Sequence, residues 1–259
     1  MKSDKSNNIK NRRSLFVIFG TTKGLGQALY NQCLSCNEND IITANRRAIK
    51  KKNARTKEIL IDLSKPIKKS KLSKIFSFAY QKLNYDNIYL VNNASVVEPI
   101  KPIGQVGSKN LTDSVYINFL NYTIIINEFI RKTAKLKANK NIINITSGAA
   151  TSAHHGLAPY CSTQSALEMF GQCIFLEQQK LKQIKILNFR PGVMNTTMQA
   201  KLRTSSKKDF SQTEMYQDIF NAKKLREPRE VAEKLYNILE QDKFWKKPIL
   251  DVSEISISK

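Results

Sequence analysis

Long hydrophobic runs are absent from this sequence of 259 residues. No run approaches the roughly 18 consecutive apolar residues that a membrane-spanning helix needs. The opening residues MKSDKSNNIKNRR are polar and lack the apolar segment of a signal peptide, so they predict a disordered basic arm over 1–13. We therefore expect a cytoplasmic protein that makes no contact with a membrane.

Cysteine, proline and glycine are also scarce, with 4, 7 and 9 residues. The low glycine and proline content indicates an ordinary globular chain, and the few cysteines fit a reducing compartment. Cys33 and Cys36 form a C-x-x-C motif at the end of a helical pattern, but no second pair accompanies it. Packed thiols are therefore favoured over a zinc or redox site, and no metal site is predicted.

Acidic residues are few: 21 Asp and Glu stand against 43 Lys and Arg, which gives a formal net charge of +22. Such a charge suits a nucleic acid or an anionic membrane. The lysines are scattered, however, and no zinc-finger, RRM or helix-turn-helix pattern accompanies them. We therefore expect a solvated basic surface that attracts phosphates, and no nucleic-acid partner.

Short apolar runs alternate with helical patterns along the chain. Because these runs are apolar almost throughout, they fit strands buried on both faces of a parallel sheet. Strands are expected over 14–20, 40–46, 58–64, 87–94, 141–147, 184–192 and 247–254. Helices are expected over 25–35, 70–83, 111–136, 158–181 and 226–241, and the polar segment 201–220 reads as a mobile loop. The pattern predicts one α/β domain over 14–259, a single Rossmann-type doubly wound parallel sheet flanked by helices.

Three glycines in the spacing G-x-x-x-G-x-G, namely Gly20, Gly24 and Gly26, separate the first strand from the first helix. They let the backbone turn sharply and approach a pyrophosphate, while the helix N-terminus offers free N–H groups and partial positive charge. Because the loop follows a strand and opens a helix, it predicts a dinucleotide site.

The end of the second strand indicates which dinucleotide is bound. An acidic residue there would bind the ribose of NAD, but Arg46 and Arg47 occupy this place and Lys23 lies in the glycine loop. Cations suit the 2′-phosphate of NADP(H). NADP(H) is therefore the predicted cofactor.

With the glycine loop, NNAS at 92–95, Ser147, and Tyr160 thirteen positions later, the chain resembles the short-chain dehydrogenase/reductase family over roughly 14–255. Ser95 replaces the glycine of the family's NNAG motif. The resemblance implies a set of cofactor-binding residues: Gly20, Thr22, Lys23, Gly24, Leu25, Gly26, Arg46, Asp62, Leu63, Asn93, Ala94, Tyr160, Gln164, Pro191, Val193 and Thr196.

Within the family, the strongest resemblance is to the branch of sepiapterin reductase and bacterial benzil reductase. It is carried by NITS, by the Tyr-Cys pair at 160–161, by RPGVMNTTMQ at 190–199 and by the terminal LDVSE. An aspartate in the last strand of sepiapterin reductase-like proteins clamps the substrate, and Asp251 matches it. A plain strand-end aspartate is the alternative. Family members often pair the helices corresponding to 111–136 and 158–181 across a homodimer, which is the expected assembly here.

The resemblance also implies the chemistry, the reduction of a small-molecule carbonyl. Ser147 would hydrogen-bond the carbonyl oxygen, Tyr160 would donate the proton, and Asn118 would hold a water in the proton relay. The family places a lysine four residues after the tyrosine, where its charge lowers the tyrosine pKa and its ammonium binds the nicotinamide ribose. This chain has Gln164 instead. The amide retains hydrogen bonds to the ribose but supplies no charge.

Three hypotheses follow from this replacement. The first, which the intact serine, tyrosine and asparagine favour, is an NADPH-dependent carbonyl reductase in which another cation, from His154 or His155, serves the site. The second is a non-redox enzyme on the same fold, an isomerase or dehydratase. The third is a catalytically impaired protein that binds NADP(H) as a sensor or partner subunit.

Overall fold

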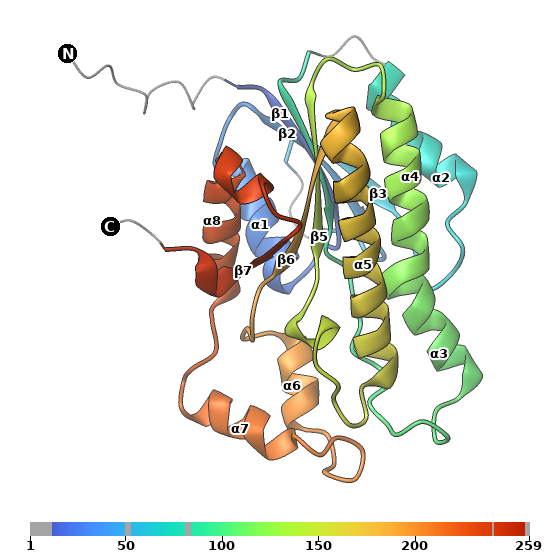
Figure 1. Cartoon of the computed structure of the whole chain (residues 1–259), viewed down its shortest axis with the longest axis vertical. Helices are drawn as coiled ribbons and strands as arrows, with labels where there is room; N and C mark the ends of the chain where they lie inside the picture. The colour runs from blue at the N-terminus through green and yellow to red at the C-terminus, as the bar shows by residue number, and fades with distance from the viewer. Residues whose placement is uncertain (1–11, 50–52, 81–83, 240, 257–259) are drawn as a thin grey trace, which may run out of the picture.

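The fold is a parallel sheet between two layers of helices (Figure 1). The computed structural model describes residues 12–49, 53–80, 84–239 and 241–256. Seven strands pair in the order β3-β2-β1-β4-β5-β6-β7, all parallel. The strands are β1 Ser14–Phe19, β2 Asn39–Asn45, β3 Thr56–Leu60, β4 Asn87–Asn92, β5 Asn139–Ile145, β6 Ile184–Arg190 and β7 Ile249–Asp251. The predicted doubly wound sheet is confirmed.

Helices cover both faces of this sheet because the central strands bury side chains on both sides. The α-helices are α1 Gly24–Leu34, α2 Lys69–Ile75, α3 Ser108–Val115, α4 Asn121–Thr133, α5 Ala158–Leu181, α6 Thr197–Arg203, α7 Thr213–Asn221 and α8 Pro228–Ile238. One core packs α1 and α8 against the sheet, and a second packs α2, α4 and α5 against the other face. None of the described helices is long and apolar enough to cross a membrane.

The segment 201–220 is not the loop that its polar sequence predicts. It contains the end of α6 and most of α7, and Phe210 between them is fully buried. Leu202 is buried beside it in the same apolar cluster. These two side chains anchor the segment over the carboxyl ends of the strands, at the bottom of Figure 1.

Several expected boundaries also moved. The predicted helix 111–136 begins earlier, at Ser108, ends at Thr133, and carries a π-helical turn, Tyr116–Leu120, between α3 and α4. The predicted helix 70–83 is α2 followed by a 3₁₀ turn, Ser77–Tyr80, and its last three residues lie outside the described ranges. β3 and β7 are shorter than expected, and a 3₁₀ turn, Val252–Glu254, follows β7 directly.

Most of the expected basic arm, residues 1–11, lies outside the part of the chain that the structure describes. Arg13, at the end of this arm, is bound to the fold. Its backbone N–H donates to Asp86, and its guanidinium pairs with Asp40 at 2.9 Å.

Asparagine side chains link three central strands. Asn92 of β4 donates to Asn144 of β5 at 2.8 Å, and Asn144 donates to Asn188 of β6 at 2.9 Å. Asn188 then donates to the backbone carbonyl of Glu168 in α5 at 3.0 Å. Gly171 lets α5 approach so closely, because a methyl group at this position would overlap the Asn188 amide. The three asparagines are fully buried.

Candidate active site

The glycine loop has the backbone conformation that its sequence predicts. Gly20 and Gly24 have positive φ values of 86° and 58°, which side chains disfavour. A methyl group at Gly26 would overlap the carbonyl of Gly20, and Asn93 donates its side-chain amide to this same carbonyl at 2.7 Å. Lys23, the N-cap of α1, makes no side-chain capping bond, and the first turn carries no acidic residue. The N-terminus of α1 is therefore open to an anion.

Basic side chains surround this helix terminus. Lys23 and Arg46 are exposed at the ends of the glycine loop and of β2. Lys201 of α6 lies near both of them. Burial, together with the charges of Lys23 and Arg46, therefore lowers the pKa of Lys201. Lys201 forms an ion pair with Glu98, which lies on the loop after β4. Three cations from separate elements thus face the predicted phosphate end of the cofactor site.

The other predicted cofactor residues lie along the same edge of the sheet. Asp62 is exposed after β3, and a hydrogen bond from the backbone of Ser64 lowers its pKa. The β6–α6 connection meets the glycine loop, since Thr196 lies against Gly24. Most of the remaining positions are held by backbone bonds or burial, namely Leu25, Leu63, Ala94, Pro191 and Val193, while Thr22 is exposed.

A cleft of about 860 Å³ starts at Gly24 and Thr196. It runs along α1 between α6 and the first residues of α8. Polar and apolar groups line it about equally, and the polar ones include amides from α1 and the guanidinium groups of Arg203 and Arg229. The cleft therefore reaches the first residue of α1.

Ser147 and Tyr160 meet as their family spacing predicts. Ser147 follows β5 and caps a 3₁₀ turn by accepting from Ala149 at 3.2 Å, and its hydroxyl neighbours the phenol of Tyr160 in the first turn of α5. Tyr160 is 8% exposed. Burial raises the pKa of Tyr160 to about 12, although the neighbouring Ser147 hydroxyl opposes this rise. The phenol is consequently protonated throughout the neutral range.

Asn118 lies in the π-helical turn between α3 and α4. Its amide exchanges two hydrogen bonds with the backbone of Val96, each 2.9 Å, and donates to Thr163 of α5 at 3.2 Å. π turns often mark functional sites because they displace one residue from the helical ladder. Here the turn holds the loop after β4 against α5 at Thr163, next to Gln164 and about one turn after Tyr160.

Gln164 is 1% exposed, and its Oε1 has no hydrogen-bond donor among the described residues. A buried acceptor without a partner is costly, typically about 1–3 kcal/mol. Since Gln164 follows Tyr160 by one helical turn, a nicotinamide ribose in the family position would offer it hydroxyl donors. The open N-terminus of α1 and this unpaired acceptor together fit a nicotinamide dinucleotide.

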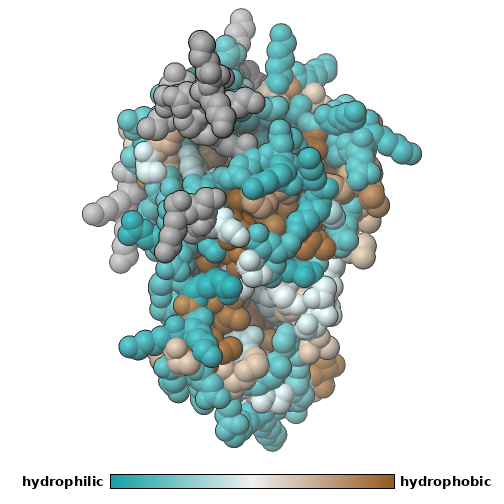
Figure 2. Space-filling model, turned by 60° about the vertical axis from the view of Figure 1, so that its left-hand side comes forward, coloured by the Kyte–Doolittle hydropathy of each residue, from teal (hydrophilic) through white to brown (hydrophobic). Residues whose placement is uncertain are grey.

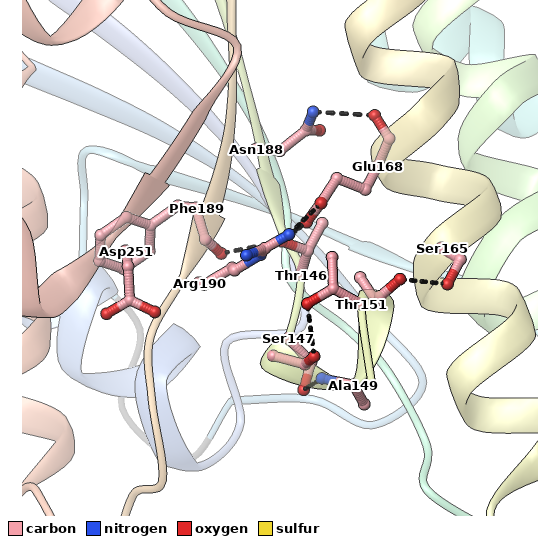
Figure 3. A network of polar contacts seen from close by, with 12 residues as sticks. Thr146, Ser147, Ala149, Thr151, Ser165, Glu168, Asn188, Phe189, Arg190 and Asp251 are labelled. Carbon is pink, nitrogen blue, oxygen red and sulfur yellow. Dashed lines mark hydrogen bonds and ion pairs between the residues drawn. The ribbon is translucent and has the colours of Figure 1, made fainter. Parts of the chain in front are cut away.

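A buried ion pair below Gln164 was not predicted from the sequence. Glu168, 3% exposed on α5, pairs with Arg190 at the end of β6 and accepts from Thr146 at 3.2 Å (Figure 3). Glu168 and Arg190 are separated by 22 residues, so no local motif joins them. The pair fixes α5 to the strands that carry Ser147.

The histidines and Asp251 have other partners. His154 is bonded to Gln212 at 2.5 Å and so ties the loop after β5 to the segment before α7, while His155 is exposed. Asp251 accepts from the backbone and hydroxyl of Ser253 and caps the last 3₁₀ turn. Figure 3 shows it apart from Ser147. Its role as a substrate clamp stays a prediction.

Apolar side chains enclose Tyr160. The buried members of this cluster come from loops, a 3₁₀ turn, α5 and α6, with partly buried residues packed on them: Val97, Ala149, Leu157, Leu202 and Phe210, then Ile100, Cys161, Met198 and Tyr216. On the face drawn in Figure 2, brown apolar side chains show where the molecule narrows above the α6–α7 segment. The sequence did not identify Phe210 or Tyr216, because the polar residues around them hide any periodicity.

The Cys33 and Cys36 thiols are free, and burial raises the pKa of Cys33 well above its ordinary value. Over the described ranges, no three His, Cys, Asp or Glu side chains are grouped so that they would hold a metal ion.

Comparison with known proteins agrees with this geometry. A family model described as short chain dehydrogenase matches residues 14–207. The benzil reductase ((S)-benzoin forming) of Bacillus cereus is 31% identical, over 92% of this chain and 98% of that protein. Its namesake from Bacillus subtilis (strain 168) is 31% identical, over 88% and 93%.

Solved structures share the fold at lower identity. A short chain dehydrogenase/reductase from Saccharomyces cerevisiae has a TM-score of 0.76 and 17% identity, over 93% of this chain and 96% of that one. A 4-hydroxyisoleucine dehydrogenase complexed with NADH has a TM-score of 0.74 and 18% identity, over 92% and 95%. The chain therefore belongs to the short-chain dehydrogenase family and is an oxidoreductase of a family that uses a nicotinamide cofactor.

Proposed function

We propose that the protein is an NADPH-dependent carbonyl reductase of the benzil reductase type, with Tyr160 as proton donor and Ser147 as the group that holds the carbonyl oxygen. The observation that carries the proposal is that Ser147 and Tyr160 are neighbours, with the Tyr160 ring enclosed by apolar side chains. The relatives that cover almost the whole chain, named for benzil reduction, support the same reaction class.

Each side chain has a distinct task in this mechanism. The hydride for the carbonyl carbon is supplied by NADPH when it is bound. Ser147 donates a hydrogen bond to the carbonyl oxygen, and Tyr160 transfers its proton to that oxygen as negative charge develops there. Gln164 accepts a hydrogen bond from the nicotinamide ribose through the Oε1 that has no protein donor. This bond runs opposite in direction to one from a lysine, which only donates.

The pKa of Tyr160, about 12, bears on the direction of the reaction. Reduction needs the phenol, which is the dominant form at neutral pH. Oxidation of the alcohol needs the phenolate, whose fraction at pH 8 is only about 10⁻⁴ for a pKa of 12. A site without the neighbouring cation therefore works as a reductase.

The preference for NADPH follows from the cations at the phosphate end. A hydrogen bond to a charged group is worth about 1.5–3 kcal/mol, or roughly a 10- to 150-fold change in Kd. Arg46→Ala should raise the Kd of NADPH by this factor and leave that of NADH nearly unchanged, measured by titration of the native protein and the variant. Equal weakening of both cofactors would refute the assignment of Arg46 to the 2′-phosphate.

Turnover tests the reaction itself. Native protein should consume NADPH in the presence of benzil, Tyr160→Phe should abolish this, and Ser147→Ala should slow it by about 10²-fold or more. The alternative is a catalytically impaired NADP(H)-binding protein, which the uncharged Gln164 favours. In that case the native chain binds NADPH but consumes none with benzil.

A homodimer through α4 and α5 is part of the proposal. Leu120, at the end of the π-helical turn, and Ile124 of α4 are 36% and 37% exposed. Met169 and Leu176 of α5 are 58% and 62% exposed. A second copy would cover these apolar side chains. In sedimentation experiments the native protein should be a dimer and Leu176→Glu a monomer. A monomeric native protein would refute this part of the proposal. The cytoplasmic location stays a prediction.

A further inference from the structure

Two phenols, not one, belong to the apolar cluster around the candidate active site. Tyr160 is a buried member of the cluster, and Tyr216 of α7 packs on the same cluster from the other side. Each phenol combines an apolar ring, which packs on this cluster, with a hydroxyl that can donate to a bound ligand.

The position of Tyr216 is fixed by its neighbours. Its ring lies 5.4 Å from the ring of Phe210 at an interplanar angle of 64°, an edge contact. Its backbone carbonyl accepts from the Gln199 side chain at 2.9 Å, which joins α7 to α6. Gln199 and Phe210 are both buried, so the ring and backbone of Tyr216 are held by packed residues.

The hydroxyl of Tyr216, in contrast, is uncommitted. It makes no hydrogen bond to any residue within the described ranges, while the Tyr160 hydroxyl has Ser147 as its neighbour. Burial raises the pKa of Tyr216, so its hydroxyl stays a donor at neutral pH. The two phenols are close enough to interact, since Tyr216 contributes to the raised pKa of Tyr160.

We propose that Tyr216 donates a hydrogen bond to a second oxygen of the substrate, adjacent to the carbonyl that Tyr160 protonates, and so selects vicinal dicarbonyls with apolar flanks. The inference rests on the proposed function of this site as a carbonyl reductase. Tyr216 is a specificity-determining residue, not a proton donor. A substrate with a single carbonyl offers this hydroxyl no acceptor, and sites built to pair a polar group discriminate against analogues that lack it.

Binding to the complex with NADP⁺ tests the inference without any turnover. The probes are benzil and deoxybenzoin, which carry the same two phenyl rings and differ by one carbonyl. Native protein should bind benzil more tightly than deoxybenzoin. Tyr216→Phe, which keeps the ring contact with Phe210, should reduce this affinity ratio by about 5- to 50-fold, almost entirely through weaker binding of benzil.

A matched control is Tyr236→Phe on α8. The Tyr236 hydroxyl accepts from Asn39 on the opposite face of the sheet, so the affinity ratio should stay at its native value. An unchanged ratio in Tyr216→Phe, or an equal loss of affinity for both ketones, would overturn the inference. If native protein fails to reduce benzil with NADPH but the binding ratio still falls in Tyr216→Phe, the proposed reductase function fails and the role of Tyr216 stands.

Discussion

Replacing Gln164 by lysine should change the pH dependence of alcohol oxidation more than any other property of the site. Gln164 lies one turn after Tyr160 on α5 and carries no charge, and the pKa of Tyr160 is about 12. An opposite charge at this distance lowers a pKa by about 1–3 units. The phenolate fraction at pH 8 then rises from about 10⁻⁴ to between roughly 10⁻³ and 10⁻¹.

The assay is the reduction of NADP⁺ by benzoin across a pH series. In the native protein the oxidation rate should rise about tenfold per pH unit without a plateau until the pH nears the pKa of Tyr160. Gln164→Lys should reach its plateau one to three units lower and oxidise benzoin about 10- to 1000-fold faster at pH 8. Reduction should change less, because the proton donor is already fully protonated there.

Gln164→Met is the matched control, since it removes the amide and adds no charge. In Gln164→Met the pH dependence of benzoin oxidation should equal that of the native protein, and only cofactor binding should be weaker. The lysine variant should also be less stable without cofactor, because the carboxylate of Glu168 is already engaged by Arg190. A native profile with the same plateau as Gln164→Lys would refute the reasoning that Tyr160 lacks a compensating cation.

Two further predictions concern the support beneath the site. Glu168→Gln should lower the free energy of unfolding by about 3 kcal/mol in urea titrations, because Arg190 keeps a largely buried charge without its partner; a loss below about 1 kcal/mol would contradict this. Gly171→Ala should destabilise by several kcal/mol despite the helix-favouring alanine, because its methyl overlaps the Asn188 amide. Gly107→Ala, with open space around the added methyl, should change stability by about 1 kcal/mol or less and serves as its control. Similar effects of the two alanines would show that α5 does not depend on close approach.

The sheet could be predicted from the sequence because two local signals, an apolar run and the turn residues after it, indicate its strands. Apolar runs such as SLFVIF indicate burial on both faces, and the glycines after this run indicate where the chain turns. α5 was predicted with its observed bounds, since its apolar residues recur over six turns. The π-helical turn at Asn118 has no local signal, because its cause is the hydrogen bonding of Asn118 with the loop after β4.

The part of the site that comes from distant contacts could not be predicted. The segment 201–220 is rich in lysine and serine, and only the burial of Leu202 and Phe210 shows that it packs on the pocket. Tyr216 is recognised only after α7 is placed beside Tyr160. The residues Ser147, Tyr160 and Gln164, in contrast, were identified through the family resemblance, which rests on local motifs and their spacing.

The asparagines in the middle of the sheet help to specify the register in which the strands pair. Strands as apolar as NIYLVN and IKILNFR can shift by two positions against a neighbour and still present the same faces, so hydrophobicity alone tolerates several pairings. Any such shift would separate Asn92, Asn144 and Asn188 and leave buried amides without partners, at about 1–3 kcal/mol each. The misaligned states are thus penalised, while the aligned one brings the end of β5, with Ser147, level with the strand ends that receive the cofactor.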